Sequence, residues 1–111
     1  MPRDSRVYLD DILEATRKIM VYTGSLSRAA FLEDEKTLDA IVRNLEVIGE
    51  AVKKLPENLR AKHSAVEWKK IAGLRDILIH EYFGIDAEIV WDIVQNKVPA
   101  LDREVRTMLN E

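Results

Sequence analysis

Arginine and histidine lie five residues apart in one polar segment of this sequence, as Arg75 and His80. A guanidinium offers a planar fork of donors to a phosphate, and an imidazole that titrates near neutral pH can take or give a proton. These are the requirements of metal-independent RNA cleavage, in which a 2′-hydroxyl attacks the adjacent phosphorus. The spacing equally fits a structural pair: a histidine that caps a helix or lies at a core edge, and Arg75 paired with Asp76 or Glu50.

The separation of the two residues limits what could bring them together. If the segment is helical, residues five apart differ in direction by about 140°. One helix alone therefore does not make Arg75 and His80 neighbours, unless the long arginine bends back toward a partner. A second copy of the helix across a two-fold axis would bring two arginines and two histidines into one cleft. Tyr82, seven residues after Arg75, would share a face with it if the helix extends that far.

The elements that must position this segment are predicted to be helices throughout. Leu, Ile and Val recur at three- and four-residue intervals, most clearly over residues 35–55. We expect helices over residues 4–23, 27–33, 35–55, 67–82 and from Asp86 onward, a single turn within 57–64, a new start or kink at Pro99, and inward-facing Ile89, Val90, Ile93 and Val94. The expected fold is all-α, an antiparallel bundle of four or five helices forming a single domain over residues 1–111.

Charge is unevenly distributed along the chain. The 111 residues carry a net charge of −3, which argues against a non-specific nucleic-acid binder. Residues 51–80 nevertheless have seven basic and three acidic side chains, a net charge of +4, while residues 1–50 carry −3 and residues 81–111 carry −4. The seven basic residues could form a phosphate-facing surface or an ordinary solvated face: Lys53, Lys54, Arg60, Lys62, Lys69, Lys70 and Arg75.

Several function classes find no support in the sequence. It has no cysteine, no P-loop, dinucleotide-binding or zinc-protease motif, and only two histidines, so we expect neither a metal nor a cofactor. His63 has no partner at a ligand spacing and is expected to be exposed to solvent. No apolar run approaches the ~20 residues of a membrane span, and a chain without cysteine suits a reducing compartment, so we expect a cytoplasmic protein without membrane contact.

The segment after Leu74 resembles the R-x(4–6)-H signature of the HEPN superfamily, and specifically the HepT-like toxins. It reads Arg75-Asp76-x-x-x-His80-x-Tyr82. The likeness extends over almost the whole chain, because further segments match in order and spacing: Arg3-Asp4 with residues 8–13, residues 43–51, Trp68 ahead of residues 72–75, and Ile89-Val90-Trp91.

The resemblance implies a homodimer whose two motifs line a shared cleft with metal-independent endoribonuclease activity, on tRNA or mRNA. Arg75 would orient or stabilise the scissile phosphate, and His80 would transfer protons. The position after the arginine is often asparagine in this family, so Asp76 is an acidic variant that could orient Arg75 or the partner's histidine. Asn44 and Glu50 could line the cleft or serve as buried hydrogen-bonding groups.

The resemblance also implies a partner, a minimal nucleotidyltransferase antitoxin of the MNT type. That partner would transfer AMP to Tyr82 and silence the nuclease, because a bulky anion two residues from His80 would occupy the phosphate site. Tyr82 could instead be a packing residue beside Phe83. The main alternative function is a non-catalytic HEPN module that binds nucleotide or assists a nucleotidyltransferase; a purely structural dimerisation domain is a third.

Overall fold

A computed structural model describes residues 4–80 and 86–111, and for Arg75, Ile77, Ile79 and His80 it describes the backbone only. The described part of the chain is helical, with no strand. Its elements are α1 (Ser5–Thr23), α2 (Arg28–Leu32), α3 (Glu35–Lys54), α4 (Glu57–Ala61), α5 (Trp68–His80), α6 (Ala87–Asn96) and α7 (Val98–Leu109). The all-α prediction is confirmed: five helices have ten or more residues, and α2 and α4 are single turns of five residues each.

Helix ends lie close to the positions that the sequence predicts, because local capping groups fix them. The side chain of Asp4 accepts a hydrogen bond from the Arg6 amide at the start of α1, and Asp34 accepts one from the Thr37 amide at the start of α3. Asp86 caps α6 in the same way. Pro99 lies in the first turn of α7, where its missing N–H is no loss.

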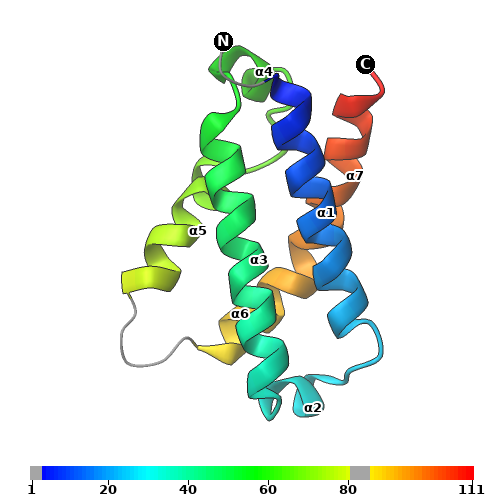
Figure 1. The fold of residues 1–111 in the computed structure, drawn as a ribbon, viewed down its shortest axis with the longest axis vertical. Coiled ribbons are helices and arrows are strands. Elements are labelled where there is room, and N and C mark those ends of the chain that lie inside the picture. Colours follow the sequence, from blue (N-terminus) through cyan, green and yellow to red (C-terminus); the bar gives the residue numbers. More distant parts are fainter. Residues whose placement is uncertain (1–3, 81–85) are drawn as a thin grey trace.

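The bundle is built on α1 and α3, which run antiparallel along the long axis of the molecule (Figure 1). Helix α7 packs against the other side of α1, and α5 packs against α3, so α1 and α3 are central and α5 and α7 are outer helices. Helices α2 and α6 close the lower end of the bundle as drawn in Figure 1. No described helix is long and apolar enough to cross a membrane.

Side chains from six helices meet in one continuous core. Phe31 of α2 is fully buried, and its ring centroid lies 5.1 Å from that of Trp91 in α6. The fully buried aliphatic side chains, each less than 2% exposed, come from α1, α3, α6 and α7: Ile12, Ile19, Ile41, Leu45, Ile48, Val52, Val90 and Val105 among them.

One inward-facing position is predicted wrongly. Ile89 is 58% exposed, whereas Val90 and Val94 are buried and Ile93 is half-buried. Successive residues of an α-helix point about 100° apart, and the buried stripe of α6 follows Val90 and Val94, which are four residues apart. Ile89 therefore lies on the side of α6 that faces solvent.

Candidate nuclease site on helix α5

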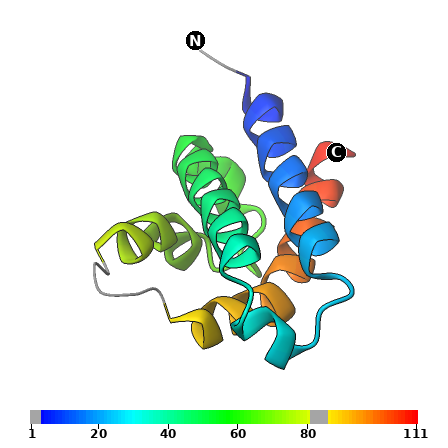
Figure 2. The ribbon, with the colours of Figure 1, turned by 60° about the horizontal axis from the view of Figure 1, so that its bottom comes forward.

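Helix α5 carries the arginine and histidine of the motif, and its first turn is fixed firmly. Trp68 is buried, and its indole Nε1 donates to the His63 carbonyl oxygen at 2.9 Å. Leu78, 8% exposed, packs in the core beside α3. The C-terminal half of α5 extends away from α6 and α7 and ends at the side of the bundle (Figures 1 and 2). A rigidly anchored helix therefore presents its motif-bearing end at the molecular surface.

The helical backbone confirms the spacing argument for the two motif residues. Residues 75 and 80 both lie within α5, so their Cα atoms are separated by a rise of about 7.5 Å and their directions by about 140°. Positions 76 and 80, four apart, share one face of the helix. The side chains of Arg75 and His80, and the whole of Tyr82, lie outside what the structure describes.

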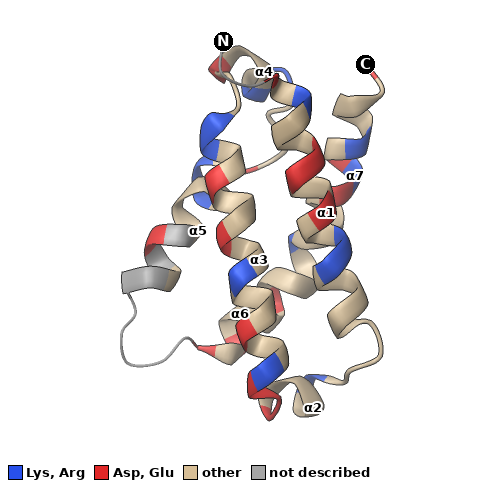
Figure 3. Cartoon of the chain, viewed as in Figure 1, with Lys and Arg blue, Asp and Glu red and all other residues tan. Residues whose placement is uncertain are grey.

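Asp76 lies between the two motif residues and faces a cation from the neighbouring helix. Its Oδ1 is 3.8 Å from Nζ of Lys53, which belongs to the last turn of α3. Both side chains are open to solvent, with exposed fractions of 60% for Asp76 and 37% for Lys53. Figure 3 shows the basic end of α3 on the same flank of the bundle as α5.

The two supporting residues predicted on α3 do not lie together. Asn44 is half-buried, and its Nδ2 donates to the Ala40 carbonyl oxygen at 2.8 Å, a bond within its own helix. Glu50 is exposed and lines a hollow of about 470 Å³ between α1 and α3, together with Tyr8 and Arg43. The structure thus places Glu50 beside α1, and it gives the Asn44 amide a hydrogen-bonding role.

His63 is not exposed, contrary to the sequence prediction. Its side chain is 8% exposed; Nδ1 lies 2.6 Å from Glu104 Oε1 in α7, and Nε2 lies 2.9 Å from Glu111 Oε1, without the alignment of a hydrogen bond. The hydrogen bond to Glu104 raises the pKa of His63; burial opposes the rise, and Glu111 adds to it. The partners are distant in sequence, so local spacing contains no signal of this contact.

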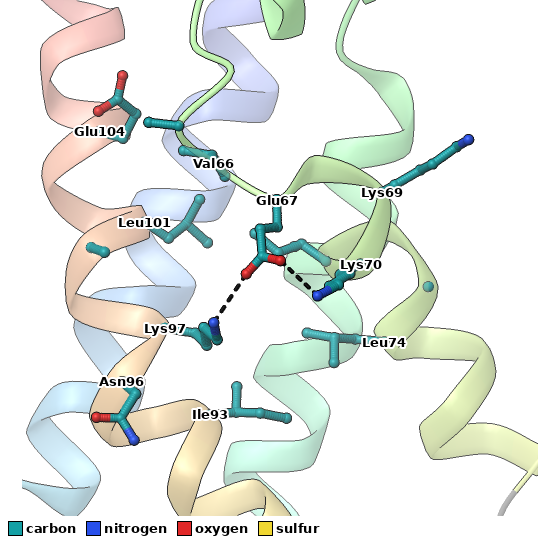
Figure 4. Close-up of a pocket in the computed structure, with 14 residues that line it drawn as sticks. Val66, Glu67, Lys69, Lys70, Leu74, Ile93, Asn96, Lys97, Leu101 and Glu104 are labelled. Atoms are coloured by element: carbon teal, nitrogen blue, oxygen red, sulfur yellow. Dashed lines mark hydrogen bonds and ion pairs between the residues drawn. The ribbon is translucent and has the colours of Figure 1, made fainter.

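A groove that the sequence does not predict lies between α5 and the α6–α7 corner (Figure 4). It has a volume of about 660 Å³, and its walls are largely apolar, with Ile71, Leu74, Ile93 and Leu101 among them. Glu67 spans its mouth, with Oε2 2.7 Å from Lys70 Nζ and Oε1 3.0 Å from Lys97 Nζ. The hydrogen bonds from Lys70 and then Lys97 lower the pKa of Glu67 to about 2.

Two of the seven basic residues expected to form a phosphate-facing surface lie beside acids within the same segment. Lys53 faces Asp76 and Lys70 pairs with Glu67, and both lysines are exposed, as are Lys54, Lys62 and Lys69. Within residues 4–80 and 86–111, no three His, Asp or Glu side chains are grouped in a way that could hold a metal ion.

Comparison with known proteins gives a consistent result. The model of the family described as "Ribonuclease HepT-like" matches residues 12–108. "Putative RNase MJ0127" of Methanocaldococcus jannaschii is 50% identical over 112 residues, covering 100% of this chain and 93% of its own. "Putative RNase TTE0752" of Caldanaerobacter subterraneus is 43% identical, covering 96% of this chain and 95% of its own.

The name of a third relative contains the family name. "Probable ribonuclease HepT" of Thermococcus cleftensis is 41% identical over 101 residues, covering 91% of this chain and 92% of its own. No solved structure matches the chain. The family match spans most of the chain, the relatives align over nearly their full lengths, and the bundle is of the HEPN type; the chain belongs to the HepT-like ribonuclease family of the HEPN superfamily.

Proposed function

We propose that this protein is a metal-independent endoribonuclease that acts as the toxin of a HEPN/MNT toxin–antitoxin pair. One observation carries the proposal: Arg75 and His80 lie on the half of α5 that reaches the surface, in a chain of the ribonuclease HepT-like family. The names of its relatives, which specify RNase or ribonuclease, support the same activity.

The proposed reaction uses only protein side chains. One His80 removes the proton of a ribose 2′-hydroxyl, whose oxygen then forms a bond to the adjacent phosphorus. The bond from phosphorus to the 5′-oxygen breaks, and a second His80 gives that oxygen a proton, leaving a 2′,3′-cyclic phosphate and a 5′-hydroxyl. Arg75 donates hydrogen bonds to the phosphate oxygens, where negative charge increases in the transition state.

Two copies of the chain are needed for this chemistry. One α5 directs positions 75 and 80 about 140° apart, so a single copy does not aim both at one phosphate. A two-fold axis beside the surface-exposed end of α5 would set Arg75 of one protomer near His80 of the other and supply two histidines. Light scattering should therefore give a dimeric mass at micromolar concentration, and a monomer would contradict the shared cleft.

The proposed control of this activity is modification of Tyr82 by an MNT-type nucleotidyltransferase. An AMP group at position 82 would place a phosphate two residues from His80 and compete with RNA for Arg75. Incubation with ATP and the transferase should increase the intact mass by one AMP and abolish cleavage. An equal mass increase in Tyr82→Phe would exclude this residue as the target.

The first experiment is cleavage of total tRNA and a model mRNA in excess EDTA. Wild-type protein, shown by intact mass to be unmodified, is compared with His80→Ala, Arg75→Ala and, as a matched surface control, Arg103→Ala on the exposed side of α7. Wild type and the Arg103 variant should give cyclic-phosphate ends, whereas the two motif variants should be inactive.

An inactive, unmodified dimer would favour the second candidate, a HEPN module that binds nucleotide or assists a nucleotidyltransferase. Two observations favour that candidate: the Asp76 carboxylate is exposed next to Arg75, and the protein as a whole carries a net negative charge. Nucleotide titration would then be the deciding measurement.

A further inference from the structure

The ion pair between α3 and α5 is too loose to be important for stability. Its Nζ–Oδ1 distance is 3.8 Å, and the side chains of Lys53 and Asp76 are 37% and 60% exposed. Exposed pairs of this kind contribute little to folding, because solvent and salt screen them and both side chains lose freedom. Its importance lies in its effect on the net charge of this part of the surface.

Asp76 occupies an unfavourable place for a negative charge if α5 binds RNA. It follows Arg75 directly and lies one helical turn before His80, on the same face of the helix as position 80. A carboxylate there repels the phosphates of the substrate and offers the Arg75 guanidinium a competing anion. Without a compensating cation, the acid would weaken binding of the phosphate that the motif has to hold.

Lys53 is placed to remove this repulsion. It comes from a different helix, and the last turn of α3 brings its ammonium to the side of α5 where Asp76 lies. The pair is neutral as a whole.

We propose that Lys53 is a positioning residue for RNA, which neutralises Asp76 and so permits a phosphodiester to approach Arg75 and His80. This inference rests on the proposed nuclease function and adds a residue that the motif does not contain. It assigns Lys53 a role in substrate binding, acting through Asp76, rather than in proton transfer.

The test is a double-mutant cycle on cleavage kinetics in EDTA. Lys53→Gln removes the compensating charge, Asp76→Asn removes the acid with little change of shape, and the third variant has both changes. Lys36→Gln is the matched control, because Lys36 is an exposed lysine in the first turn of the same helix and its loss changes the net charge equally.

The expected result is a loss of binding that removal of Asp76 reverses. An uncompensated charge about 6 Å from a phosphate at a solvated surface weakens binding by about fivefold to tenfold. Lys53→Gln should therefore raise KM by about that factor with kcat nearly unchanged, and the difference should shrink at 0.5 M salt. The double variant, which lacks both charges, should return KM to within about twofold of the wild-type value, and Lys36→Gln should behave as wild type.

The outcomes separate this inference from the proposed function. If wild type does not cleave, or His80→Ala cleaves equally well, the nuclease proposal fails. If wild type cleaves through His80 and Lys53→Gln has an unchanged KM, the role of Lys53 is refuted. A double variant that keeps the raised KM of Lys53→Gln would also refute it, because repulsion by Asp76 would then not be the cause of the loss. Thermal unfolding should shift by no more than a few degrees in every variant, since the pair is exposed.

Discussion

The contact of His63 with Glu104 and Glu111 should make the stability of the bundle depend on pH in a defined direction. Replacing His63 by alanine removes a hydrogen bond between a buried imidazole and a carboxylate at 2.6 Å. Hydrogen bonds to charged groups contribute about 1.5–3 kcal/mol. Glu104 is 29% exposed and Glu111 49% exposed, so solvent screening favours the lower part of that range, about 2 kcal/mol. For a domain of this size, that loss lowers Tm by about 8 °C.

The direction of the pH effect follows from the raised pKa of His63, which the hydrogen bond to Glu104 causes first. The stabilisation is fully present below the pKa of the unfolded histidine, near 6.5, where the imidazole is charged in both states. It is lost as the pH rises through the higher pKa of the folded state. The Tm difference between wild type and His63→Ala should therefore be largest at pH 6 and decrease toward pH 9.

Thermal unfolding followed by circular dichroism at one fixed protein concentration measures this difference. Glu104→Gln is the matched control: it retains a hydrogen-bonding side chain but removes the charge, so it should flatten the pH dependence of the difference. A difference between wild type and His63→Ala that is constant from pH 6 to 9, or that grows with pH, would refute the assigned cause.

Three further substitutions test the fold. Asp102→Ala removes a nearly buried acceptor of the Thr16 hydroxyl, at 2.8 Å, and should lower the free energy of unfolding in urea by about 2 kcal/mol; an unchanged midpoint would contradict the role of this α1–α7 link. Asp86→Ala removes the cap of α6 and should cost about 1 kcal/mol with faster amide exchange at Glu88, whereas unaltered exchange would exclude capping. Phe31→Ala should cost about 3–5 kcal/mol in the same urea assay, and a loss below 1 kcal/mol would show that its pocket collapses easily.

The fold was largely predictable because its determinants are local. Asp34 and Asp86 cap the helices that follow them, and Pro56 comes directly after Leu55, the C-cap residue of α3. The long apolar stripe of α3 becomes its buried face, with Ile41 and Leu45 nearly inaccessible. Ile89 escaped prediction because hydrophobicity alone does not specify which side of a ten-residue helix meets its neighbours.

The candidate site was predictable only where its residues are close in sequence. The order of Arg75, Asp76 and His80 on one helix follows from their spacing. The lysine opposite Asp76 comes from α3, and the carboxylates around His63 come from α7 and from the residue at the end of the chain, so their positions depend on tertiary packing. The order of charged residues along the chain does not show which of these residues will lie together in the folded protein.

The pairing of α1 with α7 has a consequence for how the protein is made. Thr16 bonds to Asp102, and the Arg6 guanidinium donates to the Leu109 carbonyl oxygen at 3.0 Å, so α1 depends on partners 86 and 103 residues further along the chain. During synthesis α1 can pack on α3 early, but its opposite side stays uncovered until α7 has left the ribosome. Completion of the bundle is therefore a late event, and a ribosome that stalls before α7 releases a chain whose first helix lacks half of its packing.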